Sequence, residues 1–381
     1  MLTDKLKAPK LDDTSLGAIK NTVQSCKDFK RKSDHFLLSK TLSKSDSKFL
    51  RMIRYETDTC IKGYATKGYY LAPVNHMWGI QNAMTDLFEK SHILKYESLQ
   101  HYQENLEVLK MVPKQIDEIQ ILLVEGAKKG ITYANESIHK AEDQFKGLQV
   151  SKVEDSKFFK QFAKIKKNVP NIQEDDAARI QNEAKAVIMN DILPKFKALQ
   201  DYIYGDYQRH LRKTPGISSL PNGQQFYQRC IEYQTSLRGV SAQDIHKVGL
   251  EEVELLRSQA EQSANEVGLK RTRFRDVVAH FTGKDMASFP TGNQTIMEFK
   301  DTVAKINPQL DQYFSKNILT DDVFDLEVKK VPEGKHGIAY YEDASFDKSR
   351  KGAFYINTQD PEYINPIEVA ALTLHEGNPG I

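Results

Sequence analysis

The fold is decided by residues 98–131, which read SLQHYQENLEVLKMVPKQIDEIQILLVEGAKKGI. Large apolar residues recur there at steps of three, four and seven positions, the spacing of one face of an α-helix. Pro113 falls inside the pattern, which predicts two helices or a kink, and Gly126 and Gly130 end the run. The apolar positions are Leu99, Leu106, Leu109, Ile116, Ile119, Leu122 and Leu123.

Further helical patterns lie on both sides of this stretch. Residues 172–211 predict a long helix that bends at Pro194. Residues 214–223 hold two Pro and two Gly and form the clearest break in the chain. Ser241 is expected to cap a helix, with Asp244 completing a loose capping box. The other amphipathic or helical segments are 155–167, 224–237, 241–265, 274–281 and 295–306.

The pattern changes after Ile318. Three short segments, 323–328, 337–341 and 352–357, predict strands. Asn365 and Pro366 then open an apolar helix that carries a His-Glu pair at its C-terminal end. The expected fold is mainly α, a large helical domain with a small β-sheet leading into this helix. The expected organisation is a poorly defined segment at 1–60, a helical domain at 61–318 and the start of a catalytic region at 319–381.

The composition is that of a globular domain. Of 381 residues, 39% are hydrophobic and 28% are charged, and the net charge is +2. A charge this small predicts no nucleic-acid partner, and no apolar stretch is long enough for a membrane span. Residues 1–14 are polar and Lys-rich without the apolar core of a signal peptide. The protein is therefore expected in the cytoplasm by default, and outside the cell if the N-terminus is incomplete.

Three cysteines, Cys26, Cys60 and Cys230, lie far apart and form no C-x-x-C pair. We expect three reduced thiols, with a structural disulfide as the alternative.

His375 and Glu376 are the candidate catalytic pair. In zinc hydrolases, an imidazole binds the metal and an adjacent Glu takes a proton from metal-bound water. The usual H-E-x-x-H signature would place a second His where Pro379 stands. The preceding run 369–374 is mostly apolar, so we expect this helix to be buried. A satisfied buried His-Glu pair without a metal is the alternative reading.

Other candidate residues carry weaker signals. His246, His336 and His76 are expected to be surface or packing residues. The pair Tyr340 and Tyr341 is first a packing feature of a strand, although one of them could donate a hydrogen bond during catalysis. Asn357 is either a turn residue at a strand end or a ligand of a substrate backbone. Strands beside such a helix suit a peptide substrate, which can pair with a strand through its main chain.

Taken together, these residues resemble the family called domain of unknown function 885 (DUF885), whose members resemble zinc metallopeptidases of the H-E-x-x-H superfamily. The resemblance covers about residues 60–380. Its most specific part is the final motif, LTLHEGNPG at 372–380. The supporting stretches are YLAPVN at 70–75, VEGAKKGI at 124–131, LPNG at 220–223, IHKVGL at 245–250, AYY at 339–341 and GAFYINT at 352–358.

The resemblance implies a zinc-dependent hydrolase of peptide bonds. The family motif reads H-E-x-x-P-G-H, so His375 is carried over as a metal ligand and Glu376 as the general base. Tyr355 and Asn357, on the strand expected to align the substrate backbone, become substrate-binding candidates. Ile381 stands where the family has its next His, and a later ligand is also missing. Because catalytic zinc takes three protein ligands, we expect weak or no zinc binding and little peptidase activity from this chain alone.

Two interpretations of this break stay open. The sequence is either a truncated form of a longer enzyme or a genuine short product without chemistry. A non-catalytic helical protein that binds peptides or a partner chain is the alternative function. A third possibility is that the shortened chain leaves too much apolar surface exposed to fold alone.

Overall fold

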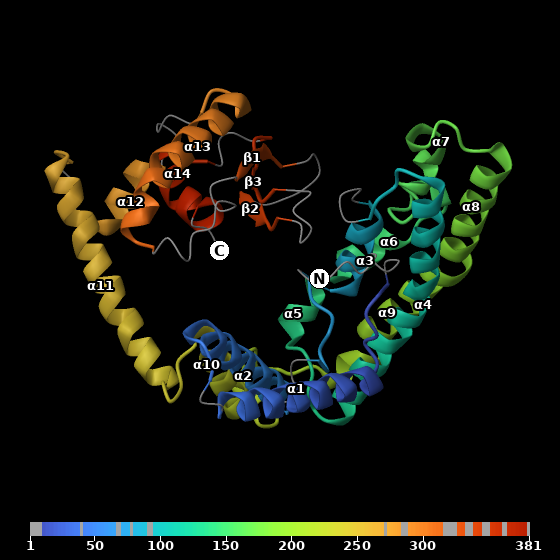
Figure 1. The fold of residues 1–381 in the computed structure, drawn as a ribbon, viewed down its shortest axis with the longest axis horizontal. Helices are drawn as coiled ribbons and strands as arrows, with labels where there is room; N and C mark the ends of the chain where they lie inside the picture. The colour runs from blue at the N-terminus through green and yellow to red at the C-terminus, as the bar shows by residue number, and fades with distance from the viewer. Residues whose placement is uncertain are drawn as a thin grey trace. The chain divides into compact units, whose positions relative to one another are not determined.

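The computed structural model describes residues 10–38, 41–65, 70–76, 79–89, 94–269, 273–282, 289–314, 326–331, 338–344, 351–359 and 364–378. The chain forms two compact units, residues 1–245 and 246–381, which are described separately (Figure 1). This division differs from the boundaries predicted at residues 60 and 318, which stay predictions about sequence organisation. The expected mainly helical fold with a small sheet is confirmed.

Unit 1 begins with two long paired helices, α1 (Leu16–Leu37) and α2 (Lys44–Ala65). A disulfide between Cys26 and Cys60 joins them, so the prediction of three reduced thiols is wrong for this pair. Cys230 is a free, partly buried thiol. The two bonded cysteines are 34 residues apart, and only the packing of α1 on α2 brings them together.

The largest part of unit 1 packs around α4 (Leu99–Lys128). All the predicted apolar positions of this helix are buried except Leu99, which is partly buried. The helix continues through Pro113, so the prediction of two separate helices is wrong. The other helices of unit 1 are α3 (Ile80–Glu89), α5 (Asn135–His139), α6 (Glu142–Leu148), α7 (Ile165–Asn168), α8 (Glu174–Val187), α9 (Leu193–Tyr204) and α10 (Gly223–Thr235).

The helical segment predicted at 172–211 forms α8 and α9, joined by a π-helical turn at Ile188–Ile192. Pro194 lies in the first turn of α9, directly after this turn. Proline has no N–H, so in a regular α-helix it leaves the carbonyl four residues earlier without a donor. A π-helical turn, in which each N–H pairs with the carbonyl five residues earlier, can give that carbonyl another donor. Proline therefore acts here through a local change in helix type.

The amphipathic pattern at 155–167 does not form a regular helix. Phe158, Phe159, Phe162 and Ile165 are buried as the pattern requires, but their backbone runs through turns and short helices. The periodicity therefore predicted correctly which side chains are buried, but it did not predict the conformation of their backbone.

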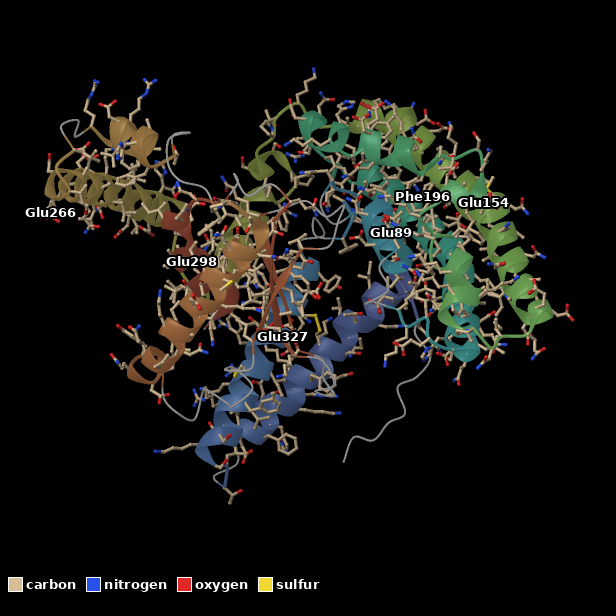
Figure 2. All side chains as sticks on the ribbon, turned by 90° about the horizontal axis from the view of Figure 1, so that it is seen from above. Glu89, Glu154, Phe196, Glu266, Glu298 and Glu327 are labelled. Atoms are coloured by element: carbon tan, nitrogen blue, oxygen red, sulfur yellow. A yellow bond between two sulfur atoms is a disulfide. The ribbon has the colours of Figure 1, made fainter. Side chains whose placement is uncertain are left out.

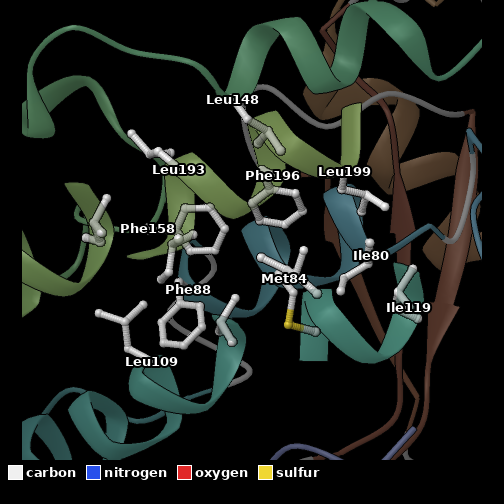
Figure 3. Packing of buried hydrophobic residues seen from close by; sticks show 14 of the residues in the cluster. Ile80, Met84, Phe88, Leu109, Ile119, Leu148, Phe158, Leu193, Phe196 and Leu199 are labelled. Carbon is white, nitrogen blue, oxygen red and sulfur yellow. The ribbon is translucent and has the colours of Figure 1, made fainter. Parts of the chain in front are cut away.

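Aromatic rings fill much of the core of unit 1. Phe158 lies between Phe88 and Phe196, with ring centroids 5.9 and 6.0 Å away (Figure 3). All three side chains are buried. Charged side chains such as Glu154 are exposed instead (Figure 2). Such rings remove a large apolar area from water and gain further from their mutual contact.

Helix α11 (Ala242–Glu266) runs from the end of unit 1 into unit 2. The predicted capping box at its start is confirmed. The backbone N–H of Ser241 donates to Oδ2 of Asp244 at 3.0 Å, and that of Asp244 donates to Oγ of Ser241 at 3.1 Å. His246 is exposed on this helix, as expected for a surface residue.

Unit 2 also contains α12 (Phe274–Thr282), α13 (Gly292–Ile306), α14 (Val369–Leu372) and a three-stranded sheet. The strands are β1 (Glu327–Lys330), β2 (Ala339–Glu342) and β3 (Ala353–Ile356), in the order β1-β3-β2. β3 pairs in parallel with β1 and antiparallel with β2. The predicted strands therefore exist, although the first part of the segment 323–328 lies outside the described residues. None of the described helices is long and apolar enough to cross a lipid bilayer.

Phe196→Ala should destabilise unit 1 by about 3–5 kcal/mol, because it leaves a cavity among buried rings. The free energy of unfolding can be measured by urea titration followed by far-UV circular dichroism. Phe49→Ala is the matched control, since Phe49 is 63% exposed. If Phe196→Ala lowered the free energy of unfolding as little as the control does, Phe196 would not be part of a tightly packed core.

Asp58→Asn should weaken the α1–α2 pair in a pH-dependent way. Burial alone would raise the pKa of Asp58, but hydrogen bonds and charge from Lys30 and Lys62 lower it to about 2. Since the folded pKa lies below the unfolded value, the stabilisation is present above about pH 4 and is lost as the pH falls toward 2. We expect a loss of about 1–2 kcal/mol at pH 7 and almost none at pH 2.

Thermal or urea unfolding at both pH values measures this difference. Asp143→Asn is the control, because the side chain of Asp143 is 98% exposed. Equal losses for Asp58→Asn at pH 7 and pH 2 would rule out the charge interaction as the cause.

Candidate functional site

The predicted His-Glu helix exists and begins as the sequence indicates. The side chain of Asn365 caps it by accepting a hydrogen bond from the N–H of Ile367 at 3.1 Å, with Pro366 in the first turn. One turn of α14 follows, and the helix then widens into a π-helical turn at Thr373–Gly377. His375 and Glu376 lie in this widened turn. Single π-turns within helices occur often at functional sites.

One face of this helix is fixed to the core of unit 2. Val369, Thr373 and Gly377, spaced by four residues, are all buried. The hydroxyl of Thr373 donates to the carbonyl of Val369 at 2.7 Å. A Cβ at Gly377 would lie 3.3 Å from Cδ1 of Phe354, so the turn packs closely on β3.

A buried hydrogen bond holds the end of the turn. Asn378 is 1% exposed, and its side-chain amide donates to Oδ1 of Asn307 at 2.6 Å. Its backbone N–H donates to the carbonyl of Thr373 at 2.9 Å. Asn307 directly follows α13, so this contact joins the His-Glu turn to that helix.

The expectation that the His-Glu helix is buried is wrong for its outer face. His375 is exposed and Glu376 is partly exposed, and Leu374 beside them is 47% exposed. Leu372 also packs against the core of unit 2, whereas Ala370, Ala371 and Leu374 of the apolar run are exposed. A satisfied buried pair therefore does not describe these two side chains within unit 2.

Of the two predicted substrate-binding residues, Tyr355 lies on β3 and Asn357 directly follows it. Tyr355 stands opposite Tyr340 of β2, and their rings stack with centroids 4.8 Å apart. Burial, with the charge of Glu342 adding to it, raises the pKa of Tyr340 to about 12 and also raises that of Tyr355. Both hydroxyls therefore keep their protons at neutral pH. Tyr340 thus packs within the sheet, as expected of it, and its stacking partner is Tyr355 rather than the neighbouring Tyr341.

Asn357 lies just after β3 and stabilises the turn there. Its side-chain Oδ1 accepts a hydrogen bond from the N–H of Gln359 at 3.0 Å, and its own N–H donates to the carbonyl of Ile338 at 2.9 Å. Because β3 is paired on both sides, a peptide that pairs through its main chain would lie along β1 or β2.

The described residues do not fit a complete zinc site. Across the part of the chain that the structure describes, no three or more His, Cys, Asp and Glu residues gather where they could hold a metal ion. A catalytic zinc takes three protein ligands. His375 offers one imidazole, and residues 379–381, at the end of the family-like motif, lie outside the described residues. His336 lies outside them as well.

The chain is mainly helical, and its small mixed sheet supports a His-Glu turn. The chain belongs to the family described as "Bacterial protein of unknown function (DUF885)", which matches residues 3–380. No curated protein matches it. Among solved structures it is similar to "the putative lipoprotein from Colwellia psychrerythraea", with a TM-score of 0.79 and 16% sequence identity. The match covers 95% of this chain and 63% of that one, and at this identity it shows the fold alone.

Asn307→Ala should loosen the His-Glu turn by removing a buried hydrogen bond, at a cost of about 1–2 kcal/mol. Amide hydrogen exchange at Asn378 should then be faster by roughly 5- to 30-fold. Asn293→Ala is the matched control, since Asn293 is exposed and bonds Lys330 on the surface. Unchanged exchange at Asn378 would show that Asn307 does not hold the turn.

Proposed function

We propose that this chain is part of a zinc-dependent metallopeptidase and supplies one metal ligand, His375, and the general base, Glu376. The observation that carries the proposal is the placement of these two residues in a widened helical turn, open to solvent and packed on a sheet. The motif at 372–380 supports the proposal as a resemblance to zinc metallopeptidases, whereas membership in DUF885 by itself names no activity.

On this proposal the chain alone is inactive. One imidazole holds zinc weakly, and the described residues bring no second and third ligand beside it. The remaining ligands would come from outside the described residues, so no catalytic step is assigned to the described part of the chain by itself. The matched solved structure contains more chain than this one spans, which is consistent with such a completion.

A peptide is the proposed substrate. The outer strands β1 and β2 could pair with an extended peptide, and the ring of Tyr355 could contact one of its side chains. Asn357, directly after β3, is the second residue proposed to contact the peptide. No nucleic-acid partner is proposed, because the net charge is only +2.

The alternative function is non-catalytic binding of a peptide or partner protein. One observation favours it: α11 carries large apolar side chains that are at least half exposed, which is unusual for a helix without a partner. They are Leu250, Val253, Leu255 and Leu256. Metal content and hydrolysis separate the two functions.

Zinc binding tests the ligand role. The purified chain should retain far less than one zinc per molecule after dialysis, and His375→Ala should remove the weak binding that calorimetry detects. His246→Ala is the matched control, as another exposed helical His. Zinc binding that survives His375→Ala would contradict the ligand role.

Hydrolysis tests the function itself. Full-length transcripts should be sequenced across the codon for Gly380, and the longer product, where it exists, assayed on peptides. Glu376→Gln in that product should lower the rate by about 10²- to 10⁴-fold while zinc is retained. A longer product that binds zinc and cleaves no peptide, or cleaves equally well as Glu376→Gln, would overturn the proposal.

A further inference from the structure

Unit 1 holds a pocket that the proposed peptidase function does not use. It measures about 440 Å³ and lies between α2 and α10. Its walls include Cys60 and Tyr64 from α2 and Phe226 and Cys230 from α10. One wall thus carries a disulfide-bonded cysteine and the other the free thiol of Cys230.

The two cysteines occupy equivalent positions on facing helices. On α2 the pocket is lined one turn before Cys60 by Glu56 and one turn after it by Gly63 and Tyr64. On α10 it is lined one turn before Cys230 by Phe226 and one turn after it by Tyr233 and Gln234. Each cysteine is therefore at the centre of its stripe, whichever way the helices run.

Nearby contacts fix how α2 and α10 run past each other. Ser236, after the end of α10, lines a second pocket with Met52 of α2. The hydroxyl of Tyr55 donates to the carbonyl of Glu232 at 3.1 Å. Residue numbers therefore rise along α2 where they fall along α10, so the two helices run antiparallel. With this register, Cys60 lies level with residues 227–228 of α10, within one helical turn of Cys230.

We propose that the free thiol of Cys230 undergoes intramolecular thiol–disulfide exchange with the Cys26–Cys60 disulfide. Its thiolate would attack Sγ of Cys60, forming a Cys60–Cys230 bond and releasing the thiolate of Cys26. One S–S bond breaks and one forms, so no external oxidant or reductant is needed. The proton leaves Cys230 to water, and Cys26 takes one from water.

The exchange would change which helices are linked. The resting bond ties α1 to α2, and the exchanged bond ties α2 to α10 across 170 residues (230 − 60). Burial raises the pKa of the Cys230 thiol, with Arg229 opposing this, so the thiol is protonated at neutral pH. The Cys26–Cys60 bond is accordingly the resting form.

Disulfide mapping tests the exchange. The dilute intact protein is incubated at pH 8.5, and portions taken at intervals are stopped with acid. The free thiols of each portion are then alkylated, and its disulfide-linked peptides are identified by mass spectrometry. We expect only the Cys26–Cys60 link at the start, and then a Cys60–Cys230 link with alkylated Cys26. The exchanged link should be absent from Cys230→Ala.

Two variants make the result decisive. In a glutathione buffer, Cys26→Ser should form the Cys60–Cys230 bond in most molecules. Cys60→Ser should leave Cys26 and Cys230 unpaired, because Cys26 does not line the pocket. Absence of the Cys60–Cys230 link from both the intact protein and Cys26→Ser would overturn the proposal. Equal pairing in Cys60→Ser would overturn it too, as it would indicate general scrambling. The disulfide map of the intact protein can be interpreted even if a variant fails to fold.

Discussion

The burial of one apolar stripe on α4 is the constraint on which unit 1 depends. This helix runs for 30 residues and packs against α3, α8 and α9. Each large aliphatic side chain that it buries contributes about 1.5–3 kcal/mol, far more than helix propensity could. The neighbouring helices have to run beside this stripe to cover it. The segment formed by α8, the π-helical turn and α9 packs against α4 in this way.

In unit 2 the limiting factor is space beneath the His-Glu turn. Phe299 of α13 and Phe354 of β3 meet edge to face, with ring centroids 5.3 Å apart, and form the floor on which the turn rests. Gly377 is the residue that permits this approach, since a side chain there would press on Phe354. With one face so tightly held, His375 and Glu376 are left on the outer face. Packing on one side thus sets which residues can meet a ligand on the other.

Much of the fold could be predicted from the sequence, because periodicity reports burial directly. It predicted α4, α10, α11 and the three strands, and the capping box at Ser241 followed from local chemistry. It failed where burial and backbone conformation separate, as at Phe158 and Phe159, which are buried outside any regular helix. The Cys26–Cys60 bond was not predictable, because the distance between two cysteines along a chain says nothing of their distance in space.

The candidate site was predictable as residues but not as an environment. The pair His375 and Glu376 was identified from the motif, yet the apolar run before it predicted burial, and the structure exposes it. Exposure changes the argument for function. A buried, satisfied pair would be closed to any metal or partner, whereas an exposed imidazole on a fixed turn can still receive further ligands. The proposed metallopeptidase function requires both features of this turn, a rigid support on one side and an open face on the other.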